Sequence, residues 1–217
     1  MSELLLVEDV ALLLLADDTG WMRGQYHEWV LAGALATELA IRGRIRLTEK
    51  GERDVRPGRV VVSDASSTDD AILDQALVRL AGRPVRWRST TVQLLRKNVK
   101  RLVLERLVER GFVEAREHRV LGLVPITVYP AVSFDYEQRL RSGLFAVLAR
   151  NEEPTVREAC IIALLSAVNM ADKVIAEDVS TVNRRAIRKR AKEMRKVHWA
   201  AETAYRLIQN QQSAAAG

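Results

Sequence analysis

Apolar residues recur along most of this chain at the three- and four-residue spacing of a helix, and only short stretches alternate as strands do. Residues 4–15 are apolar apart from one acidic pair, Glu8 and Asp9, which is typical of a buried helix with an interruption. The same spacing, with capping residues and glycine stops, predicts further helices over 28–41, 71–80, 91–110, 135–149, 159–175 and 182–208.

Two short hairpins interrupt the helical pattern. In the first, Ile45-Arg46-Leu47 alternates as a strand, and residues 59–62 return after the turn pair Pro57-Gly58. A second hairpin is expected after Gly111, and at both places a helix runs into Arg-Gly and then a strand, as in winged-helix modules. The sequence therefore predicts a mainly α-helical fold, with one domain over 1–210, two small winged-helix-like hairpins and a frayed tail over 211–217.

The composition is that of a folded, basic protein. Of the 217 residues, 48% are hydrophobic but only 5% are aromatic, so aliphatic side chains must build the core. Lys and Arg number 34 against 28 Asp and Glu, and the net charge of +6 favours anionic partners such as phospholipid headgroups or nucleic acid.

Several features indicate a cytoplasmic protein. The single cysteine, Cys160, cannot form an internal disulfide, which suits a reducing compartment. Met1-Ser2-Glu3 lacks the cationic start of a signal peptide. The longest uncharged apolar run near it, residues 10–16, is far shorter than the roughly 20 residues that a spanning helix needs.

The positive charge is concentrated in two segments. Residues 83–110 carry nine basic and two acidic side chains, and residues 181–200 carry eight basic and one acidic. A solvated helix face explains either segment alone. Two such segments on one chain favour an anionic surface as a partner.

No motif for catalysis or metal binding is present. His27, His118 and His198 lie far apart, and neither a glycine-rich phosphate loop nor a nucleophile elbow occurs. Cys160 lies at a strongly apolar helix start, where a buried inert thiol is expected rather than a nucleophile. We therefore expect no catalytic residue, no cofactor and no metal.

Lys97 and Lys100 are three residues apart within the helix predicted over 91–110. At that spacing their side chains project from neighbouring positions of one helix face, and a pair of ammonium groups can hold a phosphate. A solvated surface pair is the alternative interpretation.

Residues 121–130 are uncharged, and both alternating faces of this stretch are apolar. One interpretation is a hairpin buried between helices or in a dimer. The other is an exposed apolar loop, which monomers avoid unless it meets a membrane or a partner. In the second case the side chains expected to enter the headgroup region are Leu121, Leu123, Val124 and Ile126.

Five stretches match a known family in their order and spacing: 4–15, 38–44, 73–77, 96–111 and 136–140. Together they resemble the Golgi phosphoprotein 3 family, cytosolic peripheral membrane proteins that recognise phosphatidylinositol 4-phosphate. The resemblance covers roughly residues 4–182, and the compact form is similar to bacterial members.

This resemblance implies particular roles for residues of the chain. Lys97 and Lys100 take the place of the family's basic headgroup pair, and Trp21 is the nearest candidate for its tryptophan. An arginine of the family pocket is replaced by Ala32, which implies weak discrimination among anionic lipids. The stretch around residues 120–129 corresponds to a hairpin thought to enter the bilayer and to support self-association. The family also implies a non-catalytic adaptor for cytosolic tails of membrane enzymes such as glycosyltransferases.

The alternative is a winged-helix nucleic-acid-binding regulator, which would place the same basic helix and the run over 184–196 on phosphates. Arg96, Asn98 and Arg101 are available on that helix to read bases. Because wings that touch DNA are usually cationic, the uncharged hairpin makes nucleic acid the less favoured partner.

Overall fold

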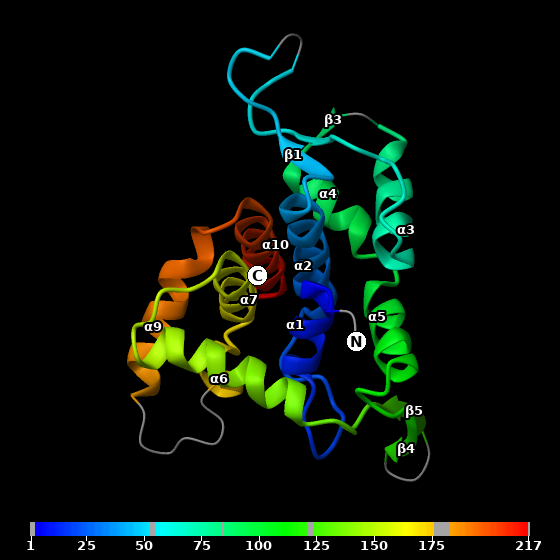
Figure 1. Ribbon diagram of the computed structural model, residues 1–217, viewed down its shortest axis with the longest axis vertical. Helices are drawn as coiled ribbons and strands as arrows, with labels where there is room; N and C mark the ends of the chain where they lie inside the picture. The colour runs from blue at the N-terminus through cyan, green and yellow to red at the C-terminus, as the bar shows by residue number, and fades with distance from the viewer. Residues whose placement is uncertain (1–2, 53–54, 84, 121–123, 176–182, 217) are drawn as a thin grey trace.

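Helix α1 (Leu6–Leu14) lies at the centre of the fold, and all nine of its residues are buried. The computed structural model describes residues 3–52, 55–83, 85–120, 124–175 and 183–216. Figure 1 shows α1 enclosed by α2 (His27–Ile41), α5 (Val99–Glu109), α6 (Asp135–Ala149) and α7 (Val156–Ala167), all of which contact it. A helix apolar on all sides is stable only when protein covers every side, which these four helices provide.

The remaining helices cover this centre from outside. α10 packs along α2, α4 and α7, while α9 packs on α6, α7 and α8. Their bounds are α3 (Ala71–Ala81), α4 (Arg88–Leu95), α8 (Ala171–Ile175), α9 (Arg184–Glu193), the 3₁₀ turn η1 (Met194–Lys196) and α10 (Trp199–Ala216).

Two small antiparallel sheets complete the fold. The first has the order β1 (Ile45–Leu47), β2 (Val60–Val62) and β3 (Val85–Arg86), so the expected hairpin gains a third strand. The second pairs β4 (Arg116–Val120) with β5 (Val124–Val128). Before each sheet the chain turns at an Arg-Gly step, with Gly43 and Gly111 at φ +69° and +73°. The prediction of a mainly helical domain with two small hairpins is thus confirmed.

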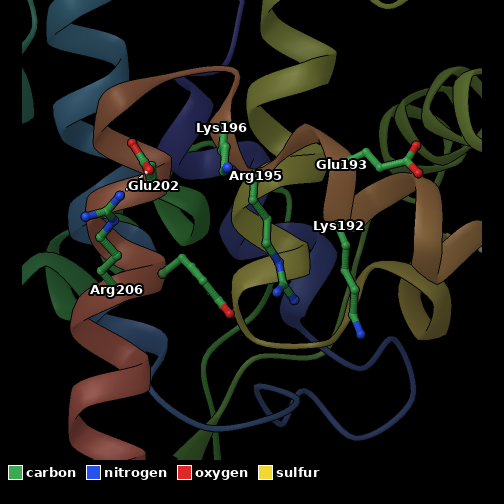
Figure 2. Close-up of a pocket in the computed structure, with 7 residues that line it drawn as sticks. Lys192, Glu193, Arg195, Lys196, Glu202 and Arg206 are labelled. Carbon is green, nitrogen blue, oxygen red and sulfur yellow. Dashed lines mark hydrogen bonds and ion pairs between the residues drawn. The ribbon is translucent and has the colours of Figure 1, made fainter.

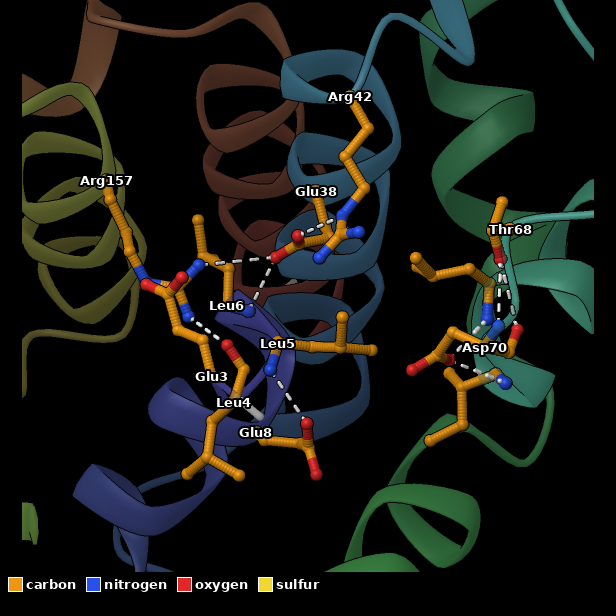
Figure 3. Close-up of polar contacts among 12 residues, drawn as sticks. Glu3, Leu4, Leu5, Leu6, Glu8, Glu38, Arg42, Thr68, Asp70 and Arg157 are labelled. Atoms are coloured by element: carbon orange, nitrogen blue, oxygen red, sulfur yellow. Dashed lines mark hydrogen bonds and ion pairs between the residues drawn. The ribbon is translucent and has the colours of Figure 1, made fainter. Parts of the chain in front are cut away.

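The acidic pair of α1 is satisfied by residues far away in the sequence. The Glu8 side chain is 0% exposed and accepts from the Leu5 backbone N–H at 2.7 Å, which caps the helix start (Figure 3). Its carboxylate also receives the Arg106 guanidinium, with Nε at 3.0 Å and Nη2 at 2.8 Å. Arg106 in turn bonds Asp70 at 2.7 Å, which caps α3. One arginine therefore links α1, α3 and α5.

Asp9 is equally buried and is held from α6 and α7. Arg157 donates to it at 2.6 and 3.0 Å, and the Tyr136 hydroxyl donates at 2.7 Å. Burial nevertheless dominates and raises the pKa of Asp9 to about 6. Beside it, Glu38 of α2 accepts from the Leu6 backbone N–H at 2.6 Å (Figure 3).

Three of the predicted long helices are broken in the structure. The helix expected over 91–110 divides into α4 and α5 at Asn98, and the helix expected over 159–175 divides into α7 and α8 at Asn169. Both asparagines adopt left-handed backbone conformations, with φ +59° and +57°, which asparagine tolerates better than most residues. The helix expected over 182–208 changes direction at η1, and α10 continues as a helix through the segment 211–216, where fraying was expected.

Cys160 is fully buried in α7, as predicted, and burial raises the pKa of its thiol to about 11. In the described part of the chain, no helix is both long and apolar enough to cross a bilayer. The same part holds no cluster of three or more His, Cys, Asp or Glu side chains suited to a metal ion.

Removing Arg106 should test the buried network. The Arg106→Ala variant leaves the buried Glu8 carboxylate with fewer partners, so we expect a loss of about 3–5 kcal/mol in the free energy of unfolding. Arg101→Ala, on the same helix, removes the ion pair with Glu105, in which the two side chains are 59% and 49% exposed. This variant should lose less than about 1 kcal/mol in the free energy of unfolding. Urea denaturation of both variants measures the difference, and equal losses would contradict the central role of the network.

Candidate functional site

The break at Asn98 separates the two lysines that the sequence placed on one helix face. Lys97 lies in the break itself with an exposed side chain, while its carbonyl accepts from Arg79 at 2.5 Å. Lys100 lies in the first turn of α5 and is half-buried. The expectation that Lys97 and Lys100 project side by side from one continuous helix is therefore wrong.

Lys100 lines a polar hollow of about 410 Å³ where α2, α5 and α10 approach one another. This volume is within the range of about 300–1,000 Å³ that is common for small-molecule sites. The residues lining this polar hollow are Tyr26, His27, Glu28, Trp29, Arg96, Lys100 and Gln211. Two cationic side chains face a single acidic one, Glu28, so the hollow has an excess of positive charge.

Arg96 is placed in this hollow by an aromatic ring. Its guanidinium lies 4.3 Å from the centre of the Trp29 ring, and Trp29 is itself buried on α2. Stacking of this kind orients the plane of the guanidinium and leaves its edge N–H groups available to an anion. Arg96, rather than Lys97, is thus the second basic group beside Lys100.

The start of α2 adds polar character to the same hollow. Tyr26 precedes the helix at φ +61°, and no side chain of the described residues caps the helix start. The backbone N–H groups of His27 and Glu28 can therefore meet an anion. His27 donates its Nε2–H to the Arg23 carbonyl at 3.0 Å. Burial lowers the pKa of His27 below its usual value, and the nearby charge of Lys100 lowers it further. Both effects favour the neutral imidazole of His27.

Lys100 also borders a second hollow, which is mainly apolar and has a volume of about 240 Å³. Trp21 and Ile126 line this apolar hollow, together with Leu15, Met22, Leu104 and residues 127–129. Trp21 is 46% exposed and meets the ring of His118 on β4 edge to face, with centroids 6.3 Å apart. Trp21, Lys100 and Ile126 thus line one hollow, although the sequence analysis assigned Trp21 and Lys100 to the headgroup site and Ile126 to the membrane-inserting hairpin. Lys97 is not among the residues that line either of these two hollows.

The loop before α2 is joined to the hairpin through Gly20. The Tyr129 backbone N–H donates to the Gly20 carbonyl at 3.0 Å. Gly20 has φ +65°, and a Cβ atom there would lie 2.3 Å from the Pro130 nitrogen. Only glycine allows this close approach, which holds the segment bearing Trp21 against β5.

A buried ion pair fixes the other end of this loop. Arg141 of α6 donates to Glu137 at 2.6 Å and to Asp17 at 3.2 Å. Glu137 is almost wholly buried, and this burial raises its pKa to about 7 in spite of Arg141.

The β4–β5 hairpin projects from the helices, as Figure 1 shows at the lower right. Val124 is 58% exposed, whereas Val128, at the base of the hairpin, is buried. The interpretation of a hairpin buried between helices is therefore wrong for Val124. Leu121 and Leu123, also predicted to enter a membrane, lie outside the described residues.

Other residues of the hollows differ from the sequence-based expectation. Ala32 is fully buried within α2, so position 32 contributes no polar group to the polar hollow. Trp29, His27 and Gln211 were not predicted to belong to a site. Arg96 follows α4 as its C-cap, and the packing of α4 on α2 brings its guanidinium over Trp29, which no local sequence signal indicates.

The fold and the two hollows define a helical domain that presents a basic, aromatic-lined site beside a projecting hairpin. Contrary to the sequence-based expectation, this hairpin is not uncharged throughout, because β4 carries charged side chains and only β5 is uncharged. The family model described as Golgi phosphoprotein 3 (GPP34) matches residues 6–211. The chain belongs to this family.

A curated relative is vacuolar protein sorting-associated protein 74 of Eremothecium gossypii. It is 25% identical over 169 residues, and the match covers 69% of this chain and 51% of the relative. The chain thus spans about half the length of this relative.

The raised pKa of Glu137 predicts a specific pH dependence. Folding raises the pKa of the Glu137 carboxyl from 4.5 to about 7. The protonated carboxyl is therefore favoured in the folded state, and its contribution to stability is complete below the unfolded pKa. This contribution is lost as the pH rises through the folded pKa. From pH 8 to pH 5, wild type should gain stability over Glu137→Gln by up to about 1.4 kcal/mol per pH unit. Urea melts across this range measure the difference, with the exposed Glu152→Gln as a control. If the free energies of unfolding of wild type and Glu137→Gln change with pH in parallel, the raised pKa of Glu137 is contradicted.

Proposed function

We propose that this protein is a non-catalytic peripheral membrane protein that binds anionic phospholipid, of the phosphatidylinositol 4-phosphate type, on the cytoplasmic face of a membrane. Membership of the Golgi phosphoprotein 3 family supports this proposal. The observation that carries it is the position of Lys100, whose side chain lines both the polar hollow and the apolar hollow beside the hairpin. Charge recognition and apolar contact are thus adjacent, which a membrane surface requires.

In the proposed mechanism, the net positive charge first draws the protein to an anionic surface, at about 1 kcal/mol for each well-placed Lys or Arg. A headgroup phosphate then enters the polar hollow between Lys100 and the stacked guanidinium of Arg96. Lys97 adds charge from outside the hollow. An ammonium group acts on phosphate as a point charge, so Lys100 provides attraction without the geometric selectivity of a bidentate arginine.

The apolar contribution comes from the hairpin and from Trp21. Val124, together with the predicted Leu121 and Leu123, would enter the headgroup region, while the indole of Trp21 lies at the interface, a position that tryptophan prefers. Ile126 lines the apolar hollow and supports the hairpin from within. Each large aliphatic side chain that becomes buried in the membrane adds roughly 1.5–3 kcal/mol to the free energy of binding. A few such side chains therefore match the contribution of the basic residues.

Two further parts of the proposal concern protein partners. We infer that cytosolic tails of membrane enzymes are the clients of the adaptor, as the family implies.

A second copy of the chain can use the same hairpin, in which case Val124 would be covered by the partner and withdrawn from the bilayer. Light scattering of wild type and of a hairpin variant, with and without liposomes, distinguishes self-association from membrane contact.

Charge reversal at Lys100 should test the headgroup site, with Lys97 as its comparison. Lys100→Glu should reduce co-sedimentation with phosphatidylinositol 4-phosphate liposomes by at least about tenfold, since it removes one cation and adds repulsion inside the hollow. Lys97→Glu changes the net charge equally but lies outside the hollow, so its effect should be smaller.

Thermal melts show whether both variants are folded, and the neutral Lys100→Gln serves if Lys100→Glu is not. Equal losses for the Lys97 and Lys100 variants would indicate diffuse charge rather than a pocket. A duplex-DNA shift at matched salt is run in parallel, and DNA binding stronger than liposome binding would overturn the proposal.

Val124→Asp should test the hairpin. Because Val124 is 58% exposed, the variant should remain folded with an unchanged melting temperature, while liposome binding falls sharply. Val78→Asp is the matched control: Val78 is 74% exposed on α3, remote from the hairpin, and its replacement should leave liposome binding unchanged. Full binding by Val124→Asp would exclude insertion at this position.

A further inference from the structure

A row of four cationic side chains runs along α9 and η1, away from the polar hollow. Its members are Arg185, Lys189, Lys192 and Lys196. Spacings of four and three residues place Arg185, Lys189 and Lys192 on one face of α9, over about 10 Å at a rise of 1.5 Å per residue, and Lys196 follows in η1. All four are exposed, and within the described residues none of them makes a hydrogen bond or an ion pair. We call this row the cationic stripe.

The opposite side of α9 attaches the helix to the domain. Ile187 and Ala191 are buried there, and Arg188 bonds the buried Asp172 at 2.7 Å. Arg190 bonds the side chain of Asn151, which follows α6. Among the described residues, packing therefore occupies the other face of α9 and does not involve the cationic stripe.

The stripe borders a groove of about 540 Å³ between η1 and α10. Figure 2 shows Arg195 between Lys192 and Arg206 in this groove. Arg195 is half-buried, donates to Ser166 at 2.6 and 2.9 Å, and stacks 4.3 Å from the centre of the Tyr205 ring. The groove thus has a fixed floor of Arg195 and Tyr205, while Lys192 and Lys196 are exposed along its rim.

The shape and charge of the groove narrow the class of partner. A flat bilayer can meet the lysines of the rim but not a floor recessed between two helices. The charge of a nucleic acid is carried by its phosphates and is negative, whereas the groove also contains Glu193 and Glu202. Glu202 pairs with Arg206 at 2.7 Å, and Glu193 makes no ion pair with any residue that the structure describes. A polypeptide of mainly acidic but mixed composition satisfies both features, because its side chains can enter the groove and its occasional cations can meet Glu193.

We propose that the cationic stripe and the adjoining groove form a docking site for an acidic polypeptide segment. Its carboxylates pair with Lys192, Lys196 and the stripe, and its backbone or an apolar side chain lies against Tyr205. This site is separate from the polar hollow: the residues of α10 near the groove are Glu202, Tyr205 and Arg206, whereas Gln211 lines the hollow. The protein would then bind a membrane and an acidic partner at the same time.

Fluorescence polarisation with a labelled peptide of alternating Glu and Ala tests the site. A length of about a dozen residues exceeds the span of the stripe, since an extended chain covers about 3.3 Å per residue. The full chain should bind this peptide, less tightly as salt increases, and should not bind the corresponding Gln–Ala peptide.

The Lys192→Glu, Lys196→Glu double variant should lose at least about tenfold in affinity for the acidic peptide, because two attractive charges become repulsive. Lys50→Glu with Arg56→Glu is the control with the same change in net charge, since both residues are exposed on the remote β1–β2 loop at the top of Figure 1. This control should bind the peptide as wild type does. Both variants are compared by thermal melts and by co-sedimentation with phosphatidylinositol 4-phosphate liposomes.

Retained liposome binding by the Lys192, Lys196 variant would support two separate sites, and loss of peptide binding alone would support the docking site. The proposal is overturned if wild type does not bind the acidic peptide or if the control variant loses as much affinity. It is also overturned if the Lys192, Lys196 variant loses binding to liposomes or to a single-stranded oligonucleotide while it still binds the peptide. The peptide-binding outcomes do not depend on whether the polar hollow binds lipid, and only the comparison on liposomes does.

Discussion

The burial of two adjacent carboxylates on α1 is the constraint on which the rest of this structure depends. Glu8 and Asp9 are both 0% exposed, and their ion-pair partners come from helices α5 and α7. Unpaired charges in such a position would cost several kcal/mol each, so the partner helices must pack where their arginines reach α1. The position of α5 that follows brings its first turn, with Lys100, beside the start of α2. The site therefore depends on the core through the same helix that neutralises Glu8.

The sequence predicted the presence of the helices and hairpins better than the residues at which the helices end. Periodic apolar residues located the helices and both hairpins, because burial of one face leaves a regular trace in the sequence. The same periodicity continues through Asn98 and Asn169, where one residue in a left-handed conformation turns the chain without disturbing the apolar pattern. A hydrophobic pattern reports which residues are buried and does not report the direction of the chain, so the breaks were missed.

The candidate site was predictable only in part for the same reason. Lys100 and Trp21 followed from a resemblance in sequence, and the structure brings them to one place. Arg96, Trp29 and Gln211 come together only after α2, α4 and α10 have packed, and no local spacing connects residues 29, 96 and 211. Contacts between residues so far apart depend on tertiary packing, which a single sequence encodes only indirectly. The two acidic residues of α1, Glu8 and Asp9, were interpreted as an interruption of the helix, although their ion pairs with Arg106 and Arg157 hold α1 in place.

The distance in sequence between α1 and its partners has a consequence for biosynthesis. Arg106 follows Glu8 by 98 residues, and Arg157 follows Asp9 by 148. At a translation rate of roughly 5–20 residues per second, α1 leaves the ribosome many seconds before either guanidinium exists. During that interval a strongly apolar segment with two unmatched acids can neither fold alone nor remain fully hydrated. The order of synthesis therefore completes the ion pairs at the centre of the domain only after α5 and α7 have been made.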